Sequence, residues 1–147
     1  MCGIFACFTN YNSSSISEKF RRQIYNALAS IQHRGQDGYG IILDGNSYDT
    51  NGKSETRIIK RTGLLPEYDE FMKSVVLDTI ILGHMRYSTN TITEKDGSTS
   101  SNSIQPIEIN KSRSMYLAHN GNLPNLVRNI KRLGLESYYQ NGTSDTF

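Results

Sequence analysis

Cys2 is the residue of this sequence that could most readily act as a nucleophile. It follows Met1, so removal of the methionine would leave it as the N-terminal residue. Its own α-amine, with an ordinary pKa of about 8, could then accept the thiol proton. Gly3 follows and would let a ligand approach the backbone. The alternative is a small residue buried in a strand, which is the usual place of a free cysteine.

Two charged residues could bind a substrate. Arg86 comes just after an apolar stretch, and its guanidinium could hold a carboxylate through two hydrogen bonds that a lysine cannot reproduce. A surface ion pair is the alternative for this arginine. Asp145 could bind an ammonium group, or it could be a solvated aspartate in a turn.

Asn120-Gly121 has two interpretations. The pair is a common turn dipeptide, and it could simply join two strands. The asparagine side-chain amide and the glycine N–H could also both donate to a developing oxyanion. The three histidines, His33, His84 and His119, are expected to be structural and to form hydrogen bonds between strands.

Composition indicates one soluble globular domain of 147 residues, with 36% hydrophobic and 20% charged residues. The net charge of +2 gives no reason to expect a nucleic acid or membrane partner. The N-terminus lacks the features of a signal peptide, so we expect a reducing cytoplasm. Cys2 and Cys7 share one predicted strand, too far apart for a disulfide, and no histidine cluster accompanies them to make a zinc site.

The elements that must position these groups follow from hydrophobic periodicity, which predicts an α+β fold. The predicted strands are residues 1–8, 39–43, 56–60, 79–84, 106–109 and 115–119. The predicted helices are one that buries Phe20, Ile24, Leu28 and Ile31, one from Pro66 to about Leu77, and one over 123–133 capped by Asn122. The first strand is apolar on both faces and is expected to be buried between layers. Residues 89–103 are expected to form a surface loop.

Together the blocks resemble the glutaminase domain of class II glutamine amidotransferases, most closely that of the amidophosphoribosyltransferase family of purine synthesis. The matching blocks, in order, are Met1-Cys-Gly-Ile4, His33-Arg-Gly-Gln-Asp37, Gly83-His-Met-Arg-Tyr-Ser-Thr89, Gln105-Pro106, His119-Asn-Gly-Asn-Leu123 and Thr143-Ser-Asp145. They extend from the first residue almost to the last. The resemblance implies the N-terminal-nucleophile hydrolase fold, a four-layer αββα sandwich, of which residues 1–147 are the N-terminal part, with no acceptor domain.

The resemblance also implies a reaction. Cys2 would attack the side-chain amide of L-glutamine and release ammonia, while Asn120 and the Gly121 N–H stabilise the oxyanion. No metal or other cofactor is implied for this step, because nucleophile, base and oxyanion donors all belong to the protein. The ammonia would pass to an acceptor domain or protein outside these residues, and an oligomer is compatible with the resemblance.

Further residues receive binding roles from the resemblance. Arg86 would hold the α-carboxylate of glutamine, and Asp145 would hold the α-ammonium. Arg34 would order the surroundings of the nucleophile. Tyr87 and Thr89 would shape the pocket.

Two alternatives to an active glutaminase remain at this point. The chain could be a catalytically silent module that binds glutamine or regulates another protein, as retention of Met1 would indicate. It could also be a fragment of a longer enzyme.

Overall fold

The computed structural model describes residues 1–9, 16–44, 56–75, 79–87, 104–110, 115–121 and 123–136. Within these ranges the chain forms two antiparallel sheets and three α-helices. The strands are β1 (Gly3–Phe8), β2 (Gly38–Asp44), β3 (Arg57–Thr62), β4 (Ile80–Arg86), β5 (Ile107–Asn110) and β6 (Met115–Leu117). The helices are α1 (Glu18–Ser30), α2 (Tyr68–Ser74) and α3 (Leu126–Leu133), with a short 3₁₀ helix, η2 (Gln32–Arg34), after α1. The predicted α+β class is confirmed at this level.

The larger sheet has the strand order β1-β4-β2-β3, with each neighbouring pair antiparallel. In its register Gly3 pairs with Met85, and Gly38 pairs with Arg86. The N-terminal ends of β1 and β2 therefore meet the C-terminal end of β4. Because side chains alternate along a strand, residues of even number on β1, β2 and β4 share one face, and those of odd number share the other.

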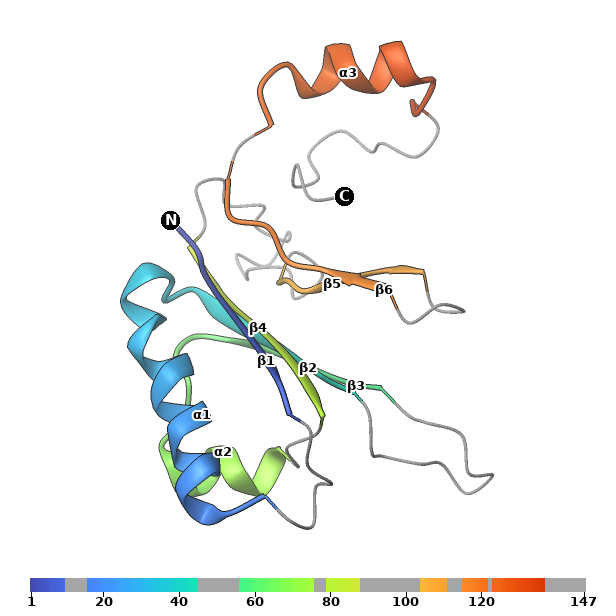
Figure 1. Ribbon diagram of the computed structural model, residues 1–147. Helices are drawn as coiled ribbons and strands as arrows, with labels where there is room; N and C mark the ends of the chain where they lie inside the picture. Colours follow the sequence, from blue (N-terminus) through green and yellow to red (C-terminus); the bar gives the residue numbers. More distant parts are fainter. Residues whose placement is uncertain are drawn as a thin grey trace.

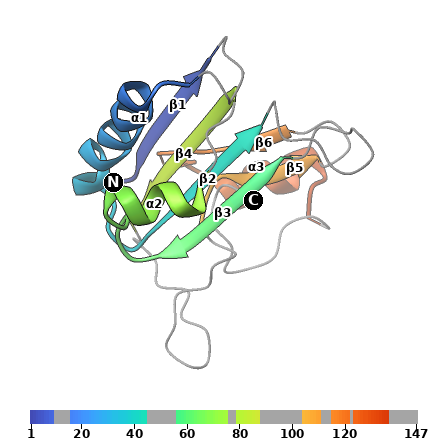
Figure 2. The same cartoon turned by 90° about the horizontal axis from the view of Figure 1, so that it is seen from below.

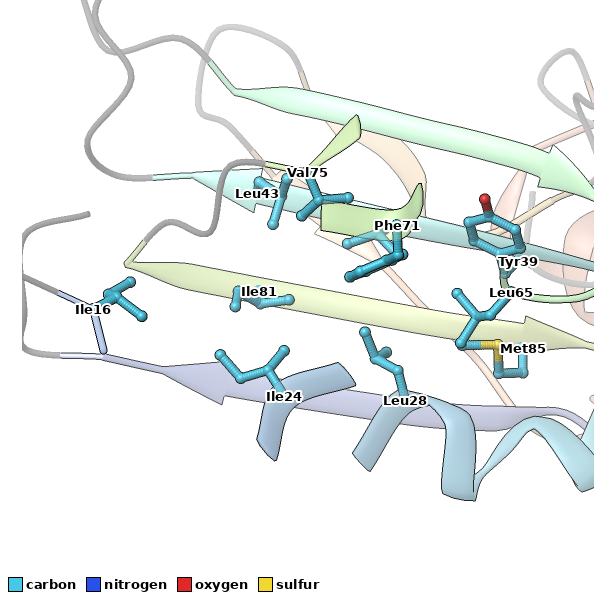
Figure 3. Packing of buried hydrophobic residues seen from close by; sticks show 11 residues of the cluster. Ile16, Ile24, Leu28, Tyr39, Leu43, Leu65, Phe71, Val75, Ile81 and Met85 are labelled. Carbon is cyan, nitrogen blue, oxygen red and sulfur yellow. The ribbon is translucent and has the colours of Figure 1, made fainter. Parts of the chain in front are cut away.

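Helices α1 and α2 cover the odd-numbered face (Figures 1 and 2). Ile24 and Leu28 of α1 point toward β4, and Phe71 of α2 packs among them (Figure 3). The predicted helical spacing is confirmed, because Ile24 and Leu28 are buried and Phe20 and Ile31 pack partly against the same core. Full burial of such a side chain contributes roughly 1.5–3 kcal/mol, so this layer holds the sheet in place.

Local contacts fix the two helices to each other. Ser17 caps α1, and its hydroxyl accepts a hydrogen bond from the Phe20 N–H at 3.3 Å. Tyr25 of α1 donates through its hydroxyl to the Pro66 carbonyl at 2.9 Å, and its ring meets Tyr68 edge to face at 5.3 Å. The second helix begins at Tyr68 rather than at Pro66, which lies two residues before it.

The β5–β6 hairpin and α3 lie on the other side of the larger sheet, with α3 beyond the hairpin (Figures 1 and 2). The predicted pair of strands is confirmed, although β6 ends at Leu117 rather than at residue 119. Ile104 joins the hairpin to the even-numbered face. The Ile104 side chain lies so close to β2 that a Cβ added to Gly38 would come within 3.0 Å of the Ile104 Cδ1.

Two further expectations need correction. Helix α3 starts at Leu126, not at residue 123, because Asn125 adopts a left-handed conformation with φ of 57° before it. Gly134 ends the helix as expected, also left-handed. The prediction that β1 is buried on both faces is wrong for the described residues: Phe5 and Cys7 pack on the core, but Ile4 is 40% and Phe8 73% exposed.

The expected loop 89–103 lies outside the described residues. The N-cap of α3 is Asn125, so the prediction that Asn122 caps this helix is wrong. Among the described helices, none is long and apolar enough to cross a membrane.

Candidate active site

Cys2 lies at the end of the larger sheet where β1 begins and β4 finishes. The Tyr87 N–H, one residue after β4, donates to the Cys2 Sγ at 3.4 Å. The same sulfur lies 3.7 Å from the Tyr87 carbonyl oxygen, to which the thiol can donate. In the antiparallel register Gly3 pairs with Met85, so Cys2 comes next to Arg86 and within reach of Tyr87, the residue after it. Both cysteines are free, as the sequence predicted.

Arg34 reaches the same place from η2. Its Nε donates to the Cys2 carbonyl at 3.3 Å, and its Nη2 lies 3.9 Å from the Met1 sulfur. Gly35 lets this segment lie against β4, because a Cβ there would overlap the Met85 carbonyl oxygen. The guanidinium thus holds the main chain at the nucleophile rather than its side chain.

Arg86 is the last residue of β4 and is buried, with 7% of its surface exposed. It occupies the even-numbered face, which it shares with the Cys2 side chain by the register. Its carbonyl accepts from the Asp37 N–H at 3.0 Å, which joins the 33–37 block to this end of β4. Tyr87, by contrast, is 51% exposed. A buried arginine beside a half-exposed tyrosine suits an anionic group of a small ligand.

His84, two residues earlier on the same face, is fully buried. Burial is the main cause that lowers its pKa from 6.5 to about 4; the nearby charges of Arg86 and His119 act in the same direction, and a hydrogen bond with the His119 backbone acts in the opposite one. At neutral pH the imidazole is therefore uncharged. His33 is exposed and its Nδ1 lies 2.8 Å from the Ser30 carbonyl at the end of α1, so it does not join two strands as predicted.

Asn120 and Gly121 follow β6 and are both exposed. Among the described residues, neither of them forms a hydrogen bond with Cys2. Their link to the site runs through His119, which influences the pKa of His84 on β4. The His119 N–H donates to Oε1 of the buried Gln105 at 2.6 Å.

The structure therefore brings together four of the residues predicted for the site: Cys2, Arg34, Arg86 and Tyr87. It places Asn120 and Gly121 on a neighbouring segment. Thr89 and Asp145 lie outside the described residues. In the part of the chain that the structure describes, no three His, Cys, Asp or Glu side chains are grouped as metal ligands.

Gln105 was missed as an individual residue by the sequence analysis. The Gln105-Pro106 pair, whose peptide bond is cis, appeared there only as part of a shared block. Its polar side chain on a buried segment is the kind of signal that could have singled it out, because buried amides form hydrogen bonds.

The sequence of this chain is similar to those of known enzymes. No family model matches the chain, but curated amidophosphoribosyltransferases do. The protein from Escherichia coli (strain K12) is 37% identical over 128 residues, which cover 85% of this chain and 23% of the relative. The protein from Lacticaseibacillus casei is 31% identical over 150 aligned residues, covering 99% of this chain and 66% of the relative. The protein from Bacillus subtilis (strain 168) is 30% identical, covering 99% of the chain and 27% of the relative.

The similarity to these proteins covers 85–99% of the chain, and the structure places Cys2 beside the buried Arg86. Together they define the class of this chain as a glutamine amidotransferase domain. The chain belongs to the amidophosphoribosyltransferase family of such domains. It spans 21–23% of the length of the first relatives that it matches.

Proposed function

We propose that this domain catalyses the glutaminase half-reaction of a glutamine amidotransferase, with Cys2 as nucleophile. The observation that carries the proposal is the position of Cys2. Its sulfur lies at the chain's N-terminal end, 3.4 Å from a backbone N–H and on the same sheet face as the buried Arg86. A hydrogen bond from an N–H favours the charged form of an acceptor, so the Tyr87 N–H would assist the thiolate.

The reaction begins once Met1 has been removed. The α-amine of Cys2 takes the thiol proton, and the thiolate attacks the side-chain amide carbon of glutamine. Asn120 and the Gly121 N–H donate to the oxyanion that forms. As this intermediate collapses, the amide nitrogen takes the proton from the α-ammonium and leaves as ammonia, which restores the free amine and forms the γ-glutamyl thioester. Water then hydrolyses the γ-glutamyl thioester, so glutamine and water yield glutamate and ammonia.

Glutamine is bound by its α-groups in this proposal. Arg86 holds the α-carboxylate, because a buried guanidinium forms stronger charge-assisted hydrogen bonds than one exposed to water. Asp145 holds the α-ammonium, and Tyr87 and Thr89 border the pocket. Arg34 fixes the Cys2 backbone through its 3.3 Å hydrogen bond, which limits the orientations of the nucleophile.

The architecture around the site supports the αββα sandwich of N-terminal-nucleophile hydrolases. Two helices cover one face of the larger sheet, while the β5–β6 hairpin and then α3 follow on the opposite side, in the order that such a sandwich requires (Figure 1). We assign residues 1–147 to the N-terminal part of that fold. The relatives are named amidophosphoribosyltransferases. The proposal therefore extends to ammonia for phosphoribosyl transfer in purine synthesis, through an acceptor domain or protein not contained in these residues, in the cytoplasm.

An active-site label tests the proposal. The purified chain is treated with a diazo-ketone analogue of glutamine, and its intact mass is recorded before and after. We expect loss of Met1 and one adduct, which Cys2→Ala abolishes and Cys7→Ala preserves. In the same assays glutamate release should fall at least about a thousandfold in Cys2→Ala.

Retained Met1 with no adduct would contradict the glutaminase function. Binding of glutamine without turnover would instead favour a silent binding or regulatory module, because the pocket would be intact and the nucleophile unused.

A further inference from the structure

Gln105 is a buried polar residue whose position is fixed by a glycine of the larger sheet. Its main chain lies directly on β2, where a Cβ on Gly40 would overlap the Gln105 carbonyl oxygen. Only 7% of the Gln105 surface is exposed. The segment that carries this side chain therefore cannot shift toward the sheet, and its neighbours leave it little room elsewhere.

The Gln105 side chain crosses to the segment after β6. Its Oε1 accepts a hydrogen bond from the His119 N–H at 2.6 Å, between residues 14 positions apart in the chain. Both hydrogen-bonding atoms are partly shielded from water, which strengthens the bond and makes its loss costly.

His119 immediately precedes the Asn120-Gly121 pair. Because its N–H is hydrogen-bonded, the main chain at His119 is restricted, and this in turn restricts the orientations of the next two peptide units. Gly121 also lies close to the His119 ring, since a Cβ on it would come within 2.8 Å of the His119 Nε2. The fixed sheet thus determines, through Gln105 and His119, where the two candidate oxyanion donors lie.

We propose that Gln105 is a positioning residue for the oxyanion hole. It touches neither substrate nor nucleophile, and it acts by holding the His119 main chain so that Asn120 and the Gly121 N–H are preorganised. This inference rests on the proposed glutaminase function. An error of about 1 Å in such donors weakens transition-state stabilisation more than substrate binding, so the effect belongs in kcat rather than in KM.

Two substitutions separate the hydrogen bond from the side-chain volume. Gln105→Met keeps the length and removes the acceptor, whereas Gln105→Glu keeps an acceptor oxygen in the same place. Gln32→Met is the matched control, because the Gln32 Oε1 accepts from the Leu65 N–H at 3.0 Å on the helix-covered side of the sheet.

Amide hydrogen exchange of the ¹⁵N-labelled full chain measures positioning without any reaction. We expect exchange at His119 to quicken at least about tenfold in Gln105→Met, to stay near the parent rate in Gln105→Glu, and to be unchanged in Gln32→Met. Amides of β4 serve as the folding reference in each variant. Unchanged exchange at His119 in a folded Gln105→Met chain would overturn the proposal.

Steady-state kinetics then test the catalytic consequence. Gln105→Met should lower kcat for glutamine hydrolysis about 10- to 100-fold, with KM changed less than about twofold, and Gln105→Glu should recover most of the loss. In an Asn120→Ala background the same substitution should cost less than about threefold, because the donor that it positions is gone. Additive losses, or a loss confined to KM, would contradict a positioning role.

The two proposals can fail separately. If the parent chain retains Met1 and releases no glutamate, the proposed glutaminase function is wrong, and so is the catalytic role of Gln105. Exchange at His119 still decides in that case whether Gln105 holds the segment. An active parent with unaffected Gln105→Met kinetics removes only the inference about Gln105.

Discussion

The two faces of the larger sheet differ in what covers them and in what they contain. The odd-numbered face packs on α1 and α2 and is apolar, with Ile81 and Met85 of β4 each 1% exposed. The even-numbered face of the same strand carries His84 and Arg86, and the register places Cys2 beside them. The first face contributes most of the apolar packing, and the second carries the candidate reactive residues. Neighbouring residues of β4 thus serve the two different purposes.

The two cysteines, one in β1 and the other just before it, show the same difference. Cys7 points toward the helix-covered core, and burial raises the pKa of its thiol. Cys2 sits at the other face and accepts a hydrogen bond from the Tyr87 N–H. A thiol whose pKa is raised by burial is a poor nucleophile at neutral pH, so only the second environment suits catalysis.

Truncation of the helix-covered core should give the largest change in stability. Leu28→Ala removes a fully buried side chain and should lower the free energy of unfolding by about 3 kcal/mol, within the usual 2–5. Phe8→Ala, on the opposite face and 73% exposed in the parent, should cost less than about 0.5 kcal/mol. Urea unfolding followed by circular dichroism measures both. Equal losses would mean that the opposite face is covered in solution, and the contrast between faces would disappear.

Acid should lower the free energy of unfolding because His84, buried on the even-numbered face, is uncharged in the folded protein. The pKa of His84 is lowered from 6.5 to about 4, so between these values the unfolded chain binds a proton that the folded chain does not. Stability present above about pH 6.5 is therefore lost as the pH falls toward 4, by as much as about 3 kcal/mol.

Unfolding in urea at pH 7 and pH 4.5 checks this expectation. The loss between the two pH values should shrink in His84→Gln and persist in a variant of the exposed His33, His33→Gln. An identical pH dependence in parent and His84→Gln would show that other groups control acid stability.

Substrate binding should respond to the shape of the cation on the even-numbered face. Arg86→Lys keeps the charge but loses the planar pair of donors, so KM for glutamine should rise about 10- to 100-fold. The exposed Arg61 of β3 provides the control, and Arg61→Lys should leave KM unchanged. A fall in kcat at constant KM would instead place Arg86 in the chemical step rather than in binding.

The helix-covered face was predictable from the sequence, and the other was not. Ile24 and Leu28 recur at helical spacing, and β2 and β3 are close in the chain, so local pattern was sufficient. The exposure of Phe8 depends on what lies over β1, and no local pattern contains that information.

The candidate site was predictable only in its components. Residue type and the shared blocks selected Cys2 and Arg86, but their proximity depends on pairing between β1 and β4. The contribution of Gln105 depends on its segment lying against Gly40 of β2 and bonding to the segment after β6. The start of α3 was wrong because the left-handed Asn125 obeys a conformational preference that hydrophobic spacing does not record.

The strand order β1-β4-β2-β3 also has a consequence for how the protein is made. β2 pairs with the next strand along the chain, but Cys2 meets Tyr87 across 85 positions of sequence. Because distant pairings form only after loop-closure entropy has been overcome, β1 joins the sheet late. During synthesis β1 is made before β4, its partner in the sheet. Until β4 has been made, Met1 lies on an unpaired segment and is accessible to an enzyme that could remove it.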